Sequence, residues 1–454
     1  MMRRYLSVPD APVDGKLVSE LHGKAGDCTD CREYRMTAIA STATLSVATP
    51  ANRWIQLGLG LICMMAISSP QYVWTLFTKP MGAAFGASPA ALQVTFSILI
   101  VLQTFFSPFQ GTLVQKFGPR RLISAGAVMS GLSWVLASQV SSLTGLYLTY
   151  GLIGGLGTGI VYIGVVGQMV GWFPDRRGFA AGVVAAGYGM GAIVTTFPIA
   201  DSIAAAGFQP TLLKFGAIFA VIGLFAALGL KAAPAASSAD AGNAGVETSA
   251  MLKTPIFWLM FIMMTMMSTS GLMVTSQMAS FAGEFGITKA LVWGFAALPL
   301  ALTVDRFTNG LTRPFFGFVS DRIGRENTMF IAFALEGVAM AVWLTTRDNA
   351  LLFVMMSGVV FFGWGEIFSL FPSTLTDTFG MKNATRNYGC LYMAQGIGAI
   401  FGGPMASLLH DATGSWTSVF GVAIGADILT AILAIAVLKP MRAAYCAQSA
   451  QLAQ

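Results

Sequence analysis

Residues 317–327, GFVSDRIGREN, follow an apolar segment that carries a lone cation, Arg313, and they resemble an earlier segment, GTLVQKFGPRR at residues 111–121. Both segments read Gly-x-x-x-[Gln/Asp]-[Lys/Arg]-x-Gly and include further basic residues. The two copies lie almost half the chain apart. This internal repeat predicts two related halves.

The composition indicates a membrane protein. Of the 454 residues, 55% are hydrophobic and only 10% are charged, whereas a soluble domain carries about 25% charged residues. Apolar runs of about 20 residues, each long enough to cross a bilayer as a helix, recur along the chain. The runs predict an all-α protein with twelve transmembrane helices near residues 54–78, 89–114, 121–140, 143–171, 178–200, 211–230, 255–283, 291–318, 328–346, 349–378, 386–410 and 415–438.

The widest gap between these runs is rich in Ala, Ser and Gly and is typical of a flexible linker. It separates six spans from six. The predicted organisation is a tail at residues 1–52, a six-helix half at 53–230, a linker at 231–254, a second six-helix half at 255–440 and a tail at 441–454.

The positions of Lys and Arg predict the orientation. Most of the 26 basic residues fall in the two tails and in alternate loops, which places both termini in the cytoplasm. The net charge of +6 therefore reflects topology and does not imply binding to nucleic acid. Duplicated six-helix halves with a substrate site between them at mid-membrane are typical of secondary transporters.

Longer motifs narrow the class. The repeated loops resemble the signature of the major facilitator superfamily. SPQYVWTLFTKP, WFPDRRGFAAGVVAAGYGMG, TRPFFGFVSDRIGR and LFPSTLTDTFG…TRNYG are similar, in that order, to the oxalate/formate antiporter family. The resemblance implies exchange of small carboxylates across a bacterial inner membrane, with no cofactor.

Arg313 is the principal candidate for substrate binding. A cation at mid-bilayer costs roughly 2.5–3.5 kcal/mol on insertion scales and usually marks a substrate path. The resemblance implies that this arginine binds the substrate carboxylate, which its planar fork suits. The alternatives are snorkelling toward the charged loop and a structural ion pair.

Arg306 lies two helical turns before Arg313, so both side chains share one helix face, with Asn309 near that stripe. An Arg–Asn–Arg path for anions is one interpretation. Asp305 is expected on the flank, close enough to pair with one of the cations. The alternative places Asp305 and Arg306 in solvent at the outer mouth.

The eleventh predicted span departs from the family pattern. Oxalate carriers have a lysine there, whereas this chain has Gln395 in YMAQGIGAIFGG. Phe368 stands where those carriers have Tyr. One cation with an amide favours a monocarboxylate such as formate, lactate or pyruvate over oxalate.

The resemblance also implies that several aromatic and amide side chains line the substrate cage, although packing is an equally good reading of aromatics in a helix bundle. These residues are Gln71, Tyr72, Tyr162, Tyr188 and Trp364.

Glu366 lies in the middle of a span, and both proton coupling and interhelical pairing stay open for it. It is expected to point away from Trp364, toward a neighbouring helix. Glu336 and Asp427 are expected to be structural.

The loops of the repeat are expected to make charge contacts that hold one gating state on the cytoplasmic side. The residues expected in this gate are Asp321, Arg322, Arg325, Lys116 and Arg120, while Gln115 replaces the usual Asp of the first copy. Simple topological anchoring is the alternative.

The leading hypothesis is a secondary carrier of small carboxylates, by antiport or proton symport with alternating access, expected to act as a monomer in the lipid bilayer. No enzyme site is expected. No metal site is expected either, because Cys28 and Cys31 provide too few ligands for zinc. A carboxylate sensor and an anion channel on the same fold are the alternatives.

Overall fold

The computed structural model describes residues 50–452, apart from 234–244 and 288–289. The predicted tail at residues 1–52 falls almost entirely outside the described residues, as do Cys28 and Cys31. Residues up to Arg442 belong to one compact unit, and the fold and the site below are those of that unit.

The first half of this unit is helical throughout. Its elements are α3 (Pro50–Ala66), α4 (Ser69–Tyr72), α5 (Trp74–Phe85), α6 (Pro89–Phe105), α7 (Ser107–Phe117), α8 (Pro119–Ala137), α9 (Leu143–Leu146), the π-helix η2 (Tyr147–Ile153), α10 (Gly154–Trp172), α11 (Arg177–Ala206) and α12 (Phe208–Leu228).

The second half adds one short hairpin to its helices. Its elements are α13 (Thr248–Met251), α14 (Pro255–Glu284), the paired strands β1 (Leu291–Val292) and β2 (Phe295–Ala296), α15 (Ala297–Ile323), α16 (Arg325–Thr345), α17 (Ala350–Trp364), α18 (Ile367–Phe379), α19 (Ala384–Ile400), η4 (Phe401–Met405), α20 (Ala406–Thr413), α21 (Trp416–Leu433), η5 (Ala434–Leu438) and α22 (Lys439–Leu452).

Within the described residues, seven helical segments are long and apolar enough to cross a membrane, or up to nine if each of two strongly bent pairs counts as one span. The remaining three of the twelve predicted spans lie on α8, α15 and α19 with its continuation. α15 fails a purely apolar criterion because it holds Asp305, Arg306 and Arg313.

The two bends arise where the helical ladder is interrupted. α6 and α7 meet at 55° around Phe106, and Pro108 at the start of α7 has no N–H to continue the ladder. By contrast, α15 runs through Pro314 as one helix.

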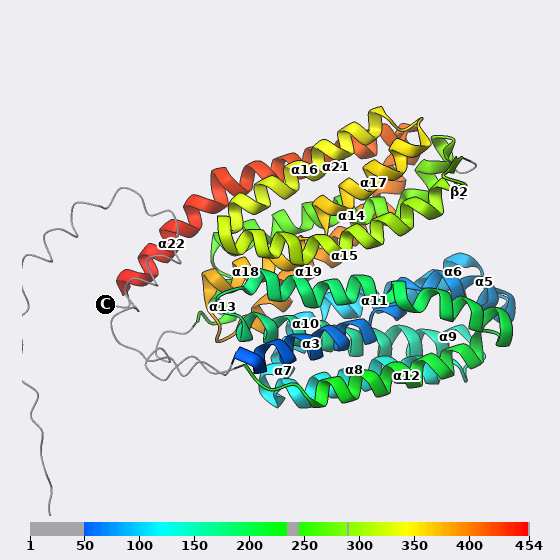
Figure 1. Cartoon of the computed structure of the whole chain (residues 1–454), viewed down its shortest axis with the longest axis horizontal. Helices are drawn as coiled ribbons and strands as arrows, with labels where there is room; N and C mark the ends of the chain where they lie inside the picture. The colour runs from blue at the N-terminus through cyan, green and yellow to red at the C-terminus, as the bar shows by residue number, and fades with distance from the viewer. Residues whose placement is uncertain (1–49, 234–244, 288–289, 453–454) are drawn as a thin grey trace, which may run out of the picture. The chain divides into compact units, whose positions relative to one another are not determined.

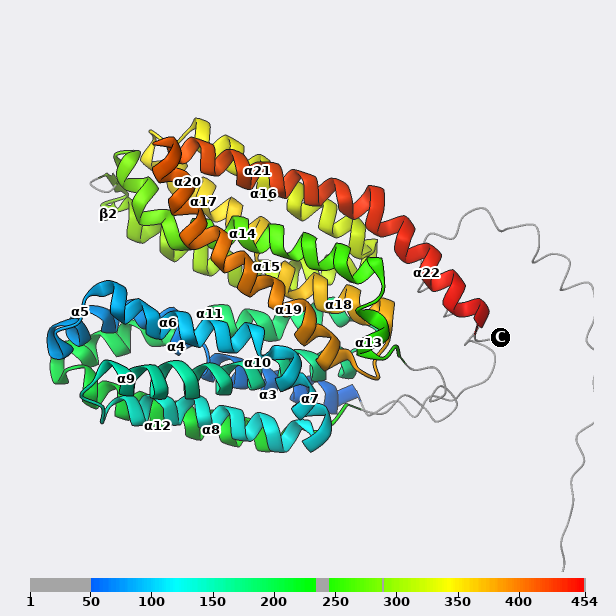
Figure 2. The same ribbon diagram turned by 180° about the vertical axis from the view of Figure 1, so that it is seen from behind.

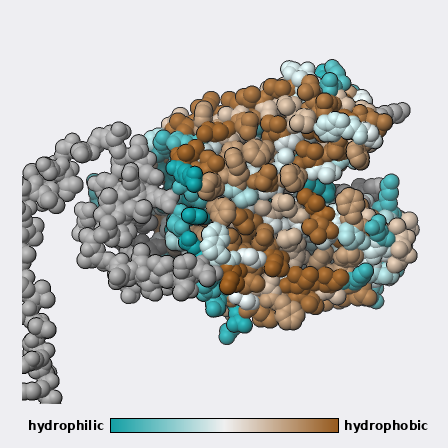
Figure 3. Space-filling model, viewed as in Figure 1, coloured by the Kyte–Doolittle hydropathy of each residue, from teal (hydrophilic) through white to brown (hydrophobic). Residues whose placement is uncertain are grey.

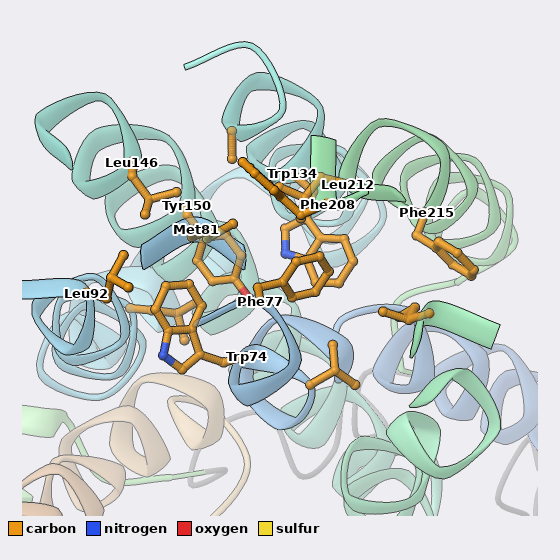
Figure 4. Packing of buried hydrophobic residues seen from close by; sticks show 14 of the residues in the cluster. Trp74, Phe77, Met81, Leu92, Trp134, Leu146, Tyr150, Phe208, Leu212 and Phe215 are labelled. Carbon is orange, nitrogen blue, oxygen red and sulfur yellow. The ribbon is translucent and has the colours of Figure 1, made fainter. Parts of the chain in front are cut away.

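The core of the first half is aromatic. Trp74 and Phe77 of α5 contact Tyr150 and Trp134 at ring-centroid distances of 4.9 and 5.3 Å, and all four side chains are at most 2% exposed. Figure 4 shows these rings turned toward one another from different helices. Burial of such large apolar surfaces fixes the packing of α5 against α8 and η2.

The two halves meet along two pairs of helices. α11 of the first half packs against α15 of the second, and α7 packs against α19 (Figures 1 and 2). Between these pairs lie α10 and α18, which also touch each other. Side chains at mid-length on the facing sides of α10, α11, α15, α18 and α19 therefore lie at the boundary between the halves.

The surface of the helices is suited to lipid. Hydrophobic side chains cover most of the length of the helices in Figure 3, and hydrophilic ones gather toward the helix ends. Exposed apolar residues such as Phe197 (74%), Phe225 (70%) and Val422 (61%) would be unfavourable in water. This pattern fits a chain that crosses a membrane several times.

The loops of the internal repeat have the same backbone geometry. Gly118 precedes α8 with φ 83° and ψ 148°, and Gly324 precedes α16 with φ 92° and ψ 157°. An L side chain rarely adopts this conformation, which explains why both copies of the repeat have glycine there. The end of the helices that carries these two loops is called the repeat-loop end below, and the opposite end, with β1 and β2, is called the hairpin end.

Candidate functional site

Arg313 of α15 is buried at the boundary between the halves, with 1% of its surface exposed. Its Nη1 donates to the carbonyl of Ala185 on α11 at 2.6 Å, while Nε and Nη2 both donate to Asn309 Oδ1, at 3.1 and 2.7 Å. The guanidinium lies 4.5 Å from the ring centroid of Phe368 on α18. All these partners are neutral, and no ion pair involves Arg313 within the described chain.

One glycine of α11 makes room for α15 at this arginine. A Cβ on Gly182 would collide with the Arg313 carbonyl, whereas a Cβ on Gly189 would lie in ordinary contact, 3.5 Å from Arg313 Cζ. α11 and α15 can therefore approach closely at Gly182 only because this position has no side chain. The close approach lets Arg313 reach across the boundary to Ala185.

Next to the arginine lies a group of tyrosines from both halves, here called the tyrosine cage: Tyr72, Tyr162, Tyr188, Tyr388 and Tyr392. Tyr162 stacks on Tyr392 at 4.8 Å and meets the edge of Tyr188 at 5.2 Å, while Tyr72 contacts Tyr188 at 5.4 Å. α10 and α11 supply Tyr162 and Tyr188, and α19 supplies Tyr388 and Tyr392.

Amide side chains complete the cage. The Tyr188 hydroxyl donates to Gln71 Oε1 at 2.5 Å and approaches Gln103 Oε1 at 3.2 Å. Gln103 Nε2 donates to the hydroxyl of Tyr392 at 3.2 Å, which connects α6 with α19. Gln71 and Tyr72 on the short helix α4 are only partly buried, so they form the more open rim of the cage.

Three polar atoms of this region have no hydrogen-bond partner in the part of the chain that the structure describes: Tyr162 Oη, Tyr388 Oη and Gln395 Oε1. Buried polar groups are nearly always paired, so unpaired ones need an explanation. The hydroxyls of Tyr162 and Tyr388 are able to donate to a small anion beside the guanidinium, whereas Gln395 is able to do so only through its amide nitrogen. Of the predicted cage residues, Gln71, Tyr72, Tyr162 and Tyr188 gather around this point.

Trp364 lies deeper in the second half than the prediction implies. Its Nε1 donates to the carbonyl of Met267 on α14 at 2.8 Å, and its ring covers Gly271. The ring contacts Phe368 edge-on at 5.7 Å. Trp364 therefore supports Phe368, and its own donor is already used by the backbone.

Asp305 is 3% exposed, so the reading that placed it in solvent is wrong. It forms no ion pair among the described residues, but Arg306, the next residue of α15, attracts it electrostatically. Arg306 itself is half-buried.

Glu366 lies between α17 and α18, is 0% exposed and has neither oxygen hydrogen-bonded in the described chain. It interacts electrostatically with Asp427 and, more weakly, with Arg313. The side chain thus turns toward the interior of the second half.

At the repeat-loop end, charged residues join the halves. Asp321 accepts hydrogen bonds from the backbone N–H groups of Gly178 and Phe179, at 3.1 and 2.9 Å, and so caps the first turn of α11. Arg325 donates to Asp321 at 2.6 Å and to Asp377 of α18 at 2.9 Å. Arg177 of α11 also pairs with Asp377.

Three other residues expected in this gate lie apart from it. Arg322 is exposed and stacks over Phe318 at 4.1 Å, Lys116 lies over Phe117 at 5.6 Å, and Arg120 is exposed. None of them forms an ion pair within the described residues. At the first copy of the repeat, Gln115 Nε2 reaches the carbonyl of Lys382 at 3.5 Å.

The sequence prediction missed five residues of these sites: Gln103, Tyr388, Tyr392, Arg177 and Asp377. Gln103 is a lone amide in the apolar run ILIVLQTFF, and Tyr388 and Tyr392 share a helix face at i, i+4. Arg177 and Asp377 lie within motifs quoted above for the family resemblance. These signals were present, but only the fold shows which side chains meet.

Comparison with known proteins agrees with this architecture. The family model described as Major Facilitator Superfamily matches residues 57–304 and 292–445. The oxalate:formate antiporter of Oxalobacter formigenes is 32% identical over 396 residues, covering 86% of this chain and 92% of that protein. Monocarboxylate transporter 13 of Bos taurus is 25% identical, covering 76% of this chain and 80% of that protein.

Among solved structures, the proton:xylose symporter XylE superposes with a TM-score of 0.66 at 13% identity, covering 86% of this chain and 97% of that one. At this identity the likeness concerns the fold alone. The matched family model and the long alignment with the antiporter show more. The chain is a multi-pass membrane transporter of the major facilitator superfamily and belongs to the oxalate/formate antiporter family.

Proposed function

We propose that this protein is a secondary active carrier of small carboxylates, with a monocarboxylate favoured over oxalate. The observation that carries the proposal is Arg313, a guanidinium 1% exposed between the two halves with only neutral hydrogen-bond partners in the described chain. Burying an uncompensated charge is costly, and an anionic substrate would compensate it. The 32% identity with the oxalate:formate antiporter of Oxalobacter formigenes supports the same substrate class.

The number of charges supports a monocarboxylate. Arg313 is the only cation among the residues that surround the tyrosine cage in the described structure, and Gln395 supplies an uncharged amide from α19. Phe368 presents a ring face to the guanidinium and no hydroxyl. One positive charge neutralises one carboxylate, whereas a second carboxylate would remain unpaired in a low-dielectric site.

The arrangement of the halves supports alternating access. Asp321, Arg325, Asp377 and Arg177 tie the repeat-loop end together across the boundary, while Gln71 and Tyr72 at the cage rim are partly exposed. In this proposal the repeat-loop end faces the cytoplasm and is closed. The substrate then enters from the hairpin end and leaves after the charged contacts separate.

The test is transport by purified protein in vesicles. Uptake of labelled formate, lactate, pyruvate and oxalate is measured with each unlabelled compound inside, so that counterflow identifies a carrier. We expect saturable exchange that is faster for a monocarboxylate than for oxalate. Arg313→Ala should reduce it by about 10²-fold, since removing one member of a buried charged pair costs roughly 2–5 kcal/mol.

Arg347→Ala is the matched control, because Arg347 is a cation at the hairpin end whose contacts are Thr417 and the ring of Phe285. Its exchange rate should match that of the unmodified protein. Exchange that survives Arg313→Ala would overturn the proposed anchor. Conduction without counterflow would replace the carrier with a channel.

A further inference from the structure

The second half contains a buried acidic cluster that the carboxylate site does not use. Glu336 of α16, Asp427 of α21 and Glu366 between α17 and α18 are each 0% exposed. Ser270 of α14 lies between the first two, with its hydroxyl 3.2 Å from Glu336 Oε1 and 2.8 Å from Asp427 Oδ2. Four helical elements thus bring their polar groups to one point.

Ser270 can satisfy only one of the two carboxyl groups at a time. A serine hydroxyl has one hydrogen, which it donates either to Asp427 or to Glu336. A proton on the second carboxyl would let that group donate to the serine oxygen. A pair of carboxylates sharing one site cannot both ionise without strong repulsion.

Glu366 adds an independent observation. Both of its oxygens are buried and unpaired within the described chain, as are Glu336 Oε2 and Asp427 Oδ1. Glu366 interacts electrostatically with both Asp427 and Glu336. None of the three acids forms an ion pair within the described residues, and acids inside a membrane often mark proton relays.

Packing holds the three acids close together. A Cβ on Gly363 of α17 would meet the backbone of Glu336 at 2.8 Å, and a Cβ on Gly337 of α16 would lie 3.2 Å from Asp427 Cβ. The glycines allow α16 to approach both α17 and α21. No group of three or more His, Cys, Asp or Glu side chains in the described residues is arranged to hold a metal ion.

The cluster is linked to the carboxylate site. Of the elements packed against it, α15 alone brings a further charged group into electrostatic range among the described residues, and that group is Arg313, which attracts Glu366. α17 ends at Trp364, and a Cβ on Gly365 would meet the Asn309 carbonyl at 2.7 Å. Thr312, next to Arg313, donates to the carbonyl of Phe362.

We propose that Glu336, Asp427, Glu366 and Ser270 form a proton-binding site whose occupancy favours carboxylate binding at Arg313. An ionised Glu366 competes with the substrate for the guanidinium, and a protonated Glu366 releases it. Binding of the proton and of the anion is therefore mutually favourable, as linkage requires. The inference rests on the proposed function and makes the carrier proton-coupled.

The first test needs no substrate. Infrared difference spectra of the purified protein in vesicles are recorded while the pH is varied. We expect a protonated-carboxyl band that titrates reversibly, that loses intensity in Glu366→Gln and Asp427→Asn, and that shifts its midpoint in Ser270→Ala, which keeps all three acids. A spectrum without such a band, or a band that no variant alters, would overturn the proton site.

The second test measures coupling with labelled formate and pyruvate. An inside-alkaline pH gradient should accelerate uptake by about fivefold or more, the lower range of typical coupling between two sites. Glu366→Gln should abolish this stimulation while retaining exchange at equal pH. Asp201→Asn, which removes an exposed carboxylate on α11, serves as the control and should keep the stimulation.

The outcomes separate the two proposals. If no carboxylate is exchanged by the unmodified protein, the proposed function fails, and the infrared titration alone decides the proton site. If exchange occurs but the gradient has no effect, or Glu366→Gln is stimulated as strongly as the unmodified protein, the coupling is wrong and the carrier remains an exchanger.

Discussion

The side-chain oxygen of Asn309 accepts hydrogen bonds from two nitrogens of Arg313, one helical turn away on α15. A neutral amide thus orients the guanidinium without neutralising it. Since a carboxylate in the same place would pair with the arginine, the amide keeps the positive charge available to an incoming anion.

Asn309→Asp should therefore weaken substrate binding at neutral pH. We expect the KM for labelled formate to rise about tenfold, because the new carboxylate competes for the guanidinium through a charge-assisted contact of roughly 1.5–3 kcal/mol. Lowering the pH should protonate the aspartate and reverse part of the effect. Asn309→Ser, which introduces no charge, should raise KM less and without this pH dependence; equal behaviour of the two variants would refute the argument.

Gln395 should influence the choice between one and two carboxylates. Gln395→Lys adds a cation from α19 at a position that is 8% exposed and has an unpaired oxygen. We expect unlabelled oxalate to compete about tenfold better against labelled formate, since a second charge-assisted contact becomes available. Gln395→Met, which changes shape without adding charge, is the control. If oxalate competes against labelled formate no better in Gln395→Lys than in the unmodified protein, Gln395 does not determine the choice between one and two carboxylates.

Gly182 should be essential for closing the halves at the repeat-loop end. A Cβ at this position would collide with the carbonyl of Arg313, and backbone atoms cannot rotate aside as a side chain can. Gly182→Ala should reach the membrane in normal amounts but exchange carboxylates at least about tenfold more slowly. Gly421→Ala on α21 is the matched control, because a Cβ there meets nothing within 4 Å. Its activity should be normal, with stability raised by at most about 1 kcal/mol.

Asp377 should stabilise the closed repeat-loop end, since it pairs with Arg177 of the first half and Arg325 of the second. Asp377→Asn removes a partly buried ion-pair partner, and the closed state should lose about 1–3 kcal/mol. The measurement uses cysteines at Gln115 and Lys382 in a background without the native cysteines, because Gln115 near the end of α7 meets Lys382 in the loop before α19. Cross-linking by a short thiol reagent should slow several-fold in Asp377→Asn. An unchanged rate would show that Asp377 does not hold the gate.

Residues with a strong local signal were placed well from sequence. The apolar runs and their breaks gave the helices, and the arginine in TRPFFGF, a cation within an apolar run, lies buried at the boundary between the halves. The glycines at positions 118 and 324 could also be recognised in the sequence as repeated positions. Their backbone conformation, which is nearly exclusive to glycine, explains why both copies keep them.

Contacts between residues that are far apart in the sequence could not be predicted. Glu336, Glu366 and Asp427 each read as a lone acid in its own span, and only the packing of α16, α17 and α21 brings them together. Helical periodicity placed Asp305 on the flank of the arginines, where Arg306 attracts it, but the burial of this carboxylate depends on the neighbouring helices. Period and spacing describe one helix, whereas a site depends on the neighbours of that helix.

Asp321 gives the first turn of α11 an acceptor from the opposite half of the protein, because its oxygens accept from Gly178 and Phe179. When the halves separate, those two backbone N–H groups lose Asp321 as their acceptor and must donate to water instead. Their hydrogens should then exchange with deuterium only when the repeat-loop end opens. The exchange rate of these two amides therefore reports how often that end opens during the transport cycle.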